Sequence, residues 1–185
     1  MTDQERVDLM AIIREQSYEE REVTLASGRK SNFYFDGKQT TLHAKGGLLV
    51  GKAFWKIVKE FGGKVDGVGG LTMGADPIAT ATSIAAALDG EQVHAFIIRK
   101  EPKGHGTGQW LEGRKNLPAG SRVVIVEDVT TTGGSSMNAV ERAEQEGLVV
   151  AGIVTLVDRE EGARENIEGA GQKLRAVFTR SEVVG

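Results

Sequence analysis

The sequence contains no cysteine, carries a net charge of only -3, and has no long run of apolar residues. Without cysteine, disulfide bonds and thiolate metal sites are excluded, and the composition is compatible with a reducing compartment. The slight acidic excess argues against a general attraction to nucleic acid or to anionic membranes. Since no apolar stretch approaches the roughly 20 residues needed to cross a bilayer, we expect no membrane partner.

The chain of 185 residues is long enough for one domain with a well-buried core, and its hydrophobic content of 39% is typical of a globular protein. Charged side chains occur throughout the first twenty residues, among them Asp3, Glu5, Arg6 and Asp8. A secretory signal peptide needs an apolar segment in that region, so none is expected. We therefore expect a cytoplasmic protein.

The most informative stretch runs from Arg122 to Ser136 and reads RVVIVEDVTTTGGSS. Four β-branched residues, Val123 to Val126, form a short apolar run that predicts a buried parallel strand. Further on, apolar residues recur at helical spacing until Gly147, which predicts a helix with a C-terminal stop. This order places the loop at the carboxyl end of the strand, where open α/β sheets bind ligands.

The composition of this loop suits a phosphate group. Gly133 and Gly134 permit a tight turn in which backbone N–H groups converge. The N-terminus of the following helix adds its positive dipole end, so the loop is predicted to be a phosphate cradle. Its hydroxyl donors are Thr130, Thr131, Thr132 and Ser135. No lysine follows the glycines, so the pattern is not a Walker A motif.

Two acids, Glu127 and Asp128, stand between the apolar run and this loop. Carboxylates suit ribose hydroxyls or a phosphate-bound Mg²⁺ rather than the phosphate itself. A buried strand with a Ser/Thr-rich end and no ligand is the plain alternative, and the acidic pair argues against it. The ligand predicted is a sugar phosphate. An apolar strand, two acids and a Thr/Gly-rich turn together resemble the phosphoribosyl pyrophosphate (PRPP) signature of the type I phosphoribosyltransferases.

Residues 21–36, REVTLASGRKSNFYFD, hold two β-prone runs around a basic turn. A solvated hairpin is the plain interpretation. Three consecutive aromatic residues beside two cations favour instead a wall for a flat, anionic ring. The stretch SGRKSNFYFD resembles the N-terminal hood of the orotate phosphoribosyltransferases. The resemblance implies that Lys30, Phe33 and Tyr34 help to hold orotate and PRPP.

Three further elements are predicted before the middle of the chain. A capping box at Thr2 and Glu5 predicts a helix over residues 3–16, and apolar spacing predicts another over 43–61. A strand at Val65–Gly69 then leads into the glycine-rich segment 69–81.

This segment, GGLTMGADPIATA, is open to two interpretations. Its glycines permit close approach of backbone to an anion, and a tight strand–helix turn accounts for them equally well. In the resembled family the loop binds pyrophosphate through backbone N–H groups, and many members carry a lysine where this chain has Met73. One cationic contact is therefore missing here, and backbone donors must suffice.

The segment 99–113, RKEPKGHGTGQWLEG, follows a strand predicted at Val93–Ile98. It crowds four potential cations into seven positions, and its glycines predict mobility. A solvated basic face is the plain alternative, whereas the position beside a phosphate cradle favours an anion-binding lid. The pattern RKExKxHG is similar to the catalytic loop of the orotate phosphoribosyltransferases. That similarity implies a homodimer in which the lid, residues 99–112, serves the neighbouring subunit.

Arg159 follows a strand predicted at Leu148–Val157. At the carboxyl end of a parallel strand it lies on the ligand side of the sheet, and its planar fork suits a carboxylate. The alternative interpretation is that Arg159 forms a surface ion pair with the neighbouring acids and binds no ligand. The resemblance implies that Arg159 binds orotate.

Alternating strands and helices predict an α/β fold with a mainly parallel central sheet flanked by helices. We expect a single domain over 1–185, with a small N-terminal hood at about 18–40 plus the N-terminal helix, and a core at about 43–180. The resemblance covers about residues 18–165. It implies an orotate phosphoribosyltransferase, EC 2.4.2.10, with Mg²⁺ bound mainly through PRPP and no metal-binding residue assigned. The alternatives are a phosphoribosyltransferase for another base and a PRPP-sensing regulator without catalytic activity.

The site residues that the resemblance implies form three groups. The catalytic residues are Lys103, His105 and Asp128. The PRPP-binding residues are Arg99, Lys100, Lys103, His105, Glu127, Asp128, Thr130, Thr131, Thr132, Gly133, Gly134 and Ser135. The orotate-binding residues are Lys30, Phe33, Tyr34, Thr131 and Arg159.

Overall fold

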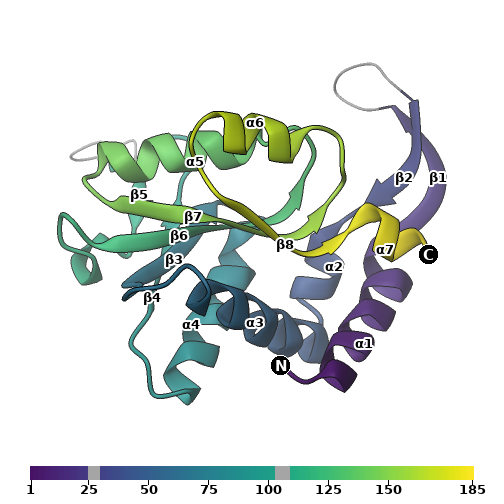
Figure 1. The fold of residues 1–185 in the computed structure, drawn as a ribbon, viewed down its shortest axis with the longest axis horizontal. Helices are drawn as coiled ribbons and strands as arrows, with labels where there is room; N and C mark the ends of the chain where they lie inside the picture. Colours follow the sequence, from purple (N-terminus) through teal and green to yellow (C-terminus); the bar gives the residue numbers. More distant parts are fainter. Residues whose placement is uncertain (25–29, 103–108) are drawn as a thin grey trace.

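The structure, a computed structural model, describes residues 1–24, 30–102 and 109–185. Its centre is a six-stranded sheet with the order β5-β4-β3-β6-β7-β8 (Figure 1). Neighbouring strands are parallel except β5, which is antiparallel to β4. The strands are β3 (Gly67–Leu71), β4 (His94–Ile98), β5 (Leu111–Glu112), β6 (Arg122–Thr130), β7 (Val149–Asp158) and β8 (Leu174–Thr179). The predicted α/β class with a mainly parallel sheet is confirmed.

Helices cover both faces of this sheet (Figure 1). On one face lie α1 (Asp3–Ile12), α3 (Ala44–Lys59) and α4 (Ala75–Leu88), and on the other lie α5 (Gly134–Gln145) and α6 (Ala163–Gly169). Alternate residues of β6 enter the two cores, with Val124 and Val126 in one and Val123 and Ile125 in the other. This alternation follows from the two-residue period of a strand that is buried on both faces.

The N-terminal region forms a separate hairpin beside the sheet. Strands β1 (Tyr18–Thr24) and β2 (Lys30–Phe35) pair antiparallel, and β2 leads into the short helix α2 (Gly37–Thr41). The hairpin rises near α2 and the C-terminal helix α7 (Arg180–Val184) (Figure 1). The predicted capping box at Thr2 is present, but the regular helix ends at Ile12 because a π-helical turn occupies residues 13–17. In the ranges given above, no helix has the length and apolar character that spanning a membrane requires.

Strand β6 is longer than the four-residue run that the sequence predicts. Its pairing with β7 continues through Glu127 opposite Thr155 to Thr130 opposite Asp158. Placing the two acids after the strand was therefore wrong: Glu127 and Asp128 lie within it, because the β7 ladder extends to their carboxyl side. The ladder consequently fixes the backbone of both acids.

The order of the strands creates a switch point between β3 and β6. From β3 the chain passes through α4 to β4, whereas from β6 it passes through α5 to β7 on the other side. The two connections thus start from adjacent strands but run in opposite directions, with α4 on one face of the sheet and α5 on the other. Such divergence opens a crevice at the carboxyl ends of the two strands, which is where doubly wound sheets bind ligands.

Candidate active site

A crevice of about 230 Å³ lies at this switch point. Its walls come from the turn after β3, from the end of β6, from α2 and from the stretch that follows β4. The lining residues are Lys38, Leu71, Thr72, Met73, Gly74, Lys100, Glu127, Asp128 and Ser135. The crevice thus brings together the acidic pair and the glycine-rich turn, and of the predicted cradle only Ser135 lines it.

The acidic pair is buried at the base of the crevice. Glu127 and Asp128 are 7% and 8% exposed, and Asp128 Oδ1 accepts the Val129 N–H at 3.0 Å. Burial, and then the neighbouring charge of Asp128, raises the pKa of Glu127 to about 8. Burial also raises the pKa of Asp128, and the ammonium group of Lys38 is the strongest influence in the opposite direction. A carboxyl pair in this state can share a proton and still accept hydrogen bonds from hydroxyl groups.

Two glycines bring backbone against Asp128 from opposite segments. A Cβ atom at Gly37 would lie 2.7 Å from Asp128 Cβ, and one at Gly74 would lie 2.5 Å from Asp128 Oδ1. The approach of Gly37 places the next residue, Lys38, in the crevice. Sequence reasoning missed Lys38. The sequence feature that could have indicated it is Asp36-Gly37-Lys38, which directly follows the aromatic run.

The predicted cradle occupies the turn from β6 into α5. Gly133 has φ 85°, and a Cβ atom added to it would lie 2.9 Å from Ile167 Cγ1, so both the left-handed turn and the packing favour glycine. Asn166 Nδ2 donates to Thr132 O at 2.9 Å and ties the turn to α6. The Thr130 hydroxyl is buried and has no hydrogen-bond partner within the part of the chain that the structure describes. Thr131 is half-buried, whereas Thr132, Gly134 and Ser135 are exposed.

The residues implied for orotate lie on three segments, and two of these residues, Phe33 and Arg159, are in contact. The guanidinium of Arg159, which is 8% exposed, lies 5.3 Å from the centre of the Phe33 ring and 2.8 Å from Glu161. Phe33 is itself only 1% exposed, so its ring supports Arg159 from within the core. Tyr34 packs under Arg21, with 3.8 Å between guanidinium carbon and ring centre. Lys30 is exposed and pairs with Glu22 at 2.9 Å.

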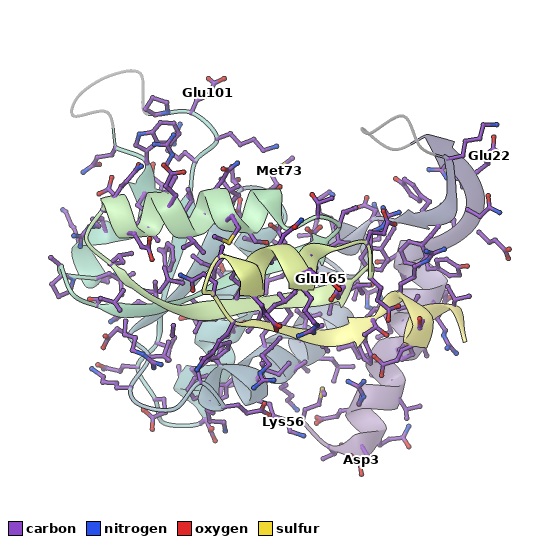
Figure 2. All side chains as sticks on the ribbon, turned by 45° about the horizontal axis from the view of Figure 1, so that its top comes forward. Asp3, Glu22, Lys56, Met73, Glu101 and Glu165 are labelled. Atoms are coloured by element: carbon purple, nitrogen blue, oxygen red, sulfur yellow. The ribbon has the colours of Figure 1, made fainter. Side chains whose placement is uncertain are left out.

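Only the two stems of the predicted lid belong to the described residues. Arg99 pairs with Glu112 at 3.1 Å, and Lys100 lines the crevice. Lys103 and His105 fall outside the described residues. Figure 2 shows exposed Met73 and Glu101 toward the side of the molecule from which the hairpin also projects.

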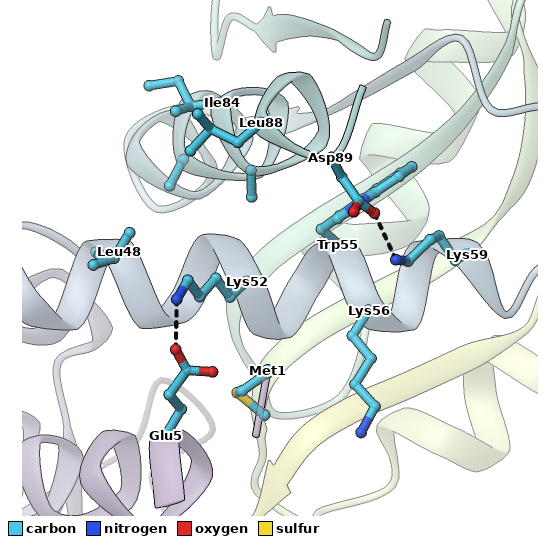
Figure 3. Close-up of a pocket in the computed structure, with 13 residues that line it drawn as sticks. Met1, Glu5, Leu48, Lys52, Trp55, Lys56, Lys59, Ile84, Leu88 and Asp89 are labelled. Carbon is cyan, nitrogen blue, oxygen red and sulfur yellow. Dashed lines mark hydrogen bonds and ion pairs between the residues drawn. The ribbon is translucent and has the colours of Figure 1, made fainter. Parts of the chain in front are cut away.

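A hollow larger than this crevice lies away from it. It measures about 610 Å³ and is bounded by α1, α3 and α4 (Figure 3). Its walls include the exposed Leu48, Ile84 and Leu88, and two of its lysines are paired with Glu5 and Asp89. An apolar wall suits the sugar phosphate predicted from the sequence poorly, whereas the smaller crevice is lined mainly by charged and polar side chains.

The sequence matches the family profile of the phosphoribosyl transferase domain over residues 38–172. It is 44% identical over 183 residues to an orotate phosphoribosyltransferase of Aquifex aeolicus, covering 97% of this chain and 98% of that one. It is also 44% identical over 174 residues to an orotate phosphoribosyltransferase of Nostoc sp., covering 94% of this chain and 82% of the relative.

Solved structures resemble the fold over nearly the whole chain. The orotate phosphoribosyltransferase of Mycobacterium tuberculosis in complex with Fe(III) dicitrate superposes with a TM-score of 0.84 at 37% identity, covering 97% of this chain and 98% of that chain. The structure of that enzyme in complex with PRPP gives a TM-score of 0.81 at 35% identity, covering 98% and 99%.

Proposed function

The chain belongs to the phosphoribosyl transferase domain family and, within it, to the orotate phosphoribosyltransferases, and we propose that the crevice between β3 and β6 is its active site. It transfers the 5-phosphoribosyl group from PRPP to orotate, which yields orotidine 5'-phosphate and pyrophosphate in pyrimidine biosynthesis. It is thus a pentosyltransferase of class EC 2.4.2.10. The observation that carries the site is the junction of a buried acidic pair with a phosphate cradle at the switch point.

In this proposal the acidic pair binds the ribose. Glu127 and Asp128 accept hydrogen bonds from the ribose hydroxyls, and the fixed backbone of β6 holds them in place. The 5'-phosphate binds at the cradle, against the N-terminus of α5, whose free N–H groups and dipole favour an anion. The cradle residues are Thr130, Thr131, Thr132, Gly133, Gly134 and Ser135.

Orotate binds between the hairpin and the end of β7. Arg159 recognises its carboxylate, because a guanidinium group can donate two parallel hydrogen bonds. Lys30, Tyr34 and Thr131 complete the ring site, and Phe33 supports Arg159 from behind, at 5.3 Å. The burial of Arg159 removes competing water and strengthens the ion pair with the substrate.

Cleavage of the bond between ribose and diphosphate builds negative charge on the leaving group and positive charge on the sugar. We assign Arg99, Lys100, Lys103 and His105 to the leaving group, where developing charge is best stabilised. Among the described residues, no group of three or more His, Asp or Glu side chains could hold a metal ion. We propose that Mg²⁺ accompanies PRPP; when bound, it would supply positive charge to the diphosphate, and no side chain is assigned as its ligand.

The proposal includes a homodimer whose lid, residues 99–112, completes the neighbouring subunit's site, and a cytoplasmic location. Neither a nucleic acid nor a membrane is a partner in it.

One experiment separates this function from its two alternatives. Purified protein is mixed with PRPP, Mg²⁺ and a panel of bases, and pyrophosphate release is followed. Release with orotate alone is expected. Release with a purine would support a different base, and PRPP binding without release would support a regulator.

A further inference from the structure

One fixed cation in the crevice has no role in the function described so far. Of the two lysines that line it, Lys100 belongs to a stem of the lid, whereas Lys38 belongs to α2. Helix α2 is tied to Ser17, at the end of the π-helical turn, through Thr40: the Thr40 hydroxyl lies 2.7 Å from Ser17 Oγ, and the Thr40 N–H donates to the same oxygen at 3.1 Å. The backbone of Gly37 packs directly on Asp128. Lys38 is therefore held at the acidic pair before any substrate arrives.

We propose that Lys38 binds the diphosphate group of PRPP, and of the product pyrophosphate, from the α2 side of the crevice. This inference rests on the proposed function and adds a substrate-binding residue to it. An ammonium group has three N–H donors, and Asp36 Oδ1 takes one of them at 2.6 Å. Two donors remain for ligand oxygens, opposite the turn that carries Thr72 and Gly74.

The charges around the crevice explain why a cation is needed there. A diphosphate enters beside the acids Glu127, Asp128 and Asp36, and only Lys38 and Lys100 oppose them among the described lining residues and their partners. Met73, on the facing turn, is 66% exposed and brings no charge. The hydrogen bond to Asp36, and then the charge of Asp128, raises the pKa of Lys38, so the ammonium stays charged at neutral pH. Such a cation reduces repulsion between the diphosphate and the acidic pair.

A purely structural role for Lys38 would rest on its ion pair with Asp36. Asp36 is also the N-cap of α2, where its Oδ1 accepts the Lys38 N–H at 3.2 Å. The two roles can be separated, because asparagine caps a helix as well as aspartate does but carries no charge. Asp36→Asn keeps α2 in place and removes the ion pair, while Lys38→Met removes the ammonium.

The test is calorimetric titration of wild type, Lys38→Met, Lys38→Arg and Asp36→Asn with pyrophosphate and Mg²⁺, and separately with orotidine 5'-phosphate, which lacks a diphosphate. Lys38→Met should weaken pyrophosphate binding and raise the KM for PRPP about 10- to 100-fold, as expected for a charged hydrogen bond. Its affinity for orotidine 5'-phosphate and its melting temperature should stay within experimental error of wild type. Lys38→Arg should recover most of the loss, and Asp36→Asn should bind pyrophosphate at least as tightly as wild type.

Two outcomes overturn the assignment while wild type still converts orotate and PRPP. One is Lys38→Met binding pyrophosphate as tightly as wild type. The other is equal weakening by Lys38→Met and Asp36→Asn, which would mean that the lysine acts only through its ion pair. Absence of turnover by wild type overturns the proposed function itself, and the assignment of Lys38 with it.

Discussion

Gly74→Ala tests whether the position of Asp128 controls PRPP binding and turnover. Gly74 has φ -61°, a helical value that alanine adopts without strain. The added Cβ would lie 2.5 Å from Asp128 Oδ1 and 2.9 Å from its Cγ. Ordinary contact begins at 3.4 Å, so the two groups must separate by about 0.9 Å, the difference between 3.4 and 2.5. The acid carries most of this shift, because the turn at Gly74 continues into α4.

A displacement of about 1 Å in a catalytic group can lower a rate on the order of 100-fold. We expect kcat/KM for PRPP to fall by about 30- to 100-fold when pyrophosphate release is measured against PRPP concentration. The added methyl group overpacks the turn, and we expect it to lower the free energy of unfolding by about 1–3 kcal/mol. Gly169→Ala is the matched control, since its Cβ would meet open space in α6, and it should leave kcat/KM unchanged.

A double-mutant cycle with Asp128→Ala decides the matter, and it is measured as the calorimetric affinity for PRPP because Asp128 variants are expected to be inactive. Once the carboxyl group is gone, the added methyl has nothing to displace, so Gly74→Ala should weaken PRPP binding little further in that background. Losses of PRPP affinity that multiply fully would refute the reasoning, because they would show that the methyl acts elsewhere.

The remaining predictions concern the ring site, the acidic pair and the lid. Arg159→Ala should raise the KM for orotate by about one to three orders of magnitude while the calorimetric affinity for PRPP changes little; equal losses would count against the orotate assignment. Folding raises the pKa of Glu127 from 4.5 to about 8, so this carboxyl costs stability increasingly as pH rises through that range. The gain in melting temperature from Glu127→Gln should thus grow from near zero at pH 4.5 to its maximum above pH 8, and a gain independent of pH would contradict the shift. Mixing inactive Lys103→Ala with inactive Asp128→Asn and allowing subunit exchange should restore activity if the lid acts in the neighbouring subunit, and a mixture that stays inactive after confirmed exchange would place the lid in its own chain.

Local features of the sequence were enough to predict most single elements. The capping box at Thr2, the apolar period of α3 and the glycine turn before α5 each depend on residues within a few positions of one another. The alternation of strands and helices likewise predicted the fold class, because it restricts how a parallel sheet can be connected. Residues that share one strand–turn–helix unit, such as Asp128 and Ser135, could be assigned to one site from the sequence.

The tertiary structure decided how far β6 extends and which distant residues face the acidic pair. Glu127 and Asp128 belong to the strand because β7 pairs with it that far, and no local pattern reveals a partner strand's length. Lys38 and Asp128 meet only because β6 lies next to β3 and α2 packs across its end. Contacts between residues this far apart in the chain depend on the order of strands in the sheet, and apolar spacing carries no information about that order.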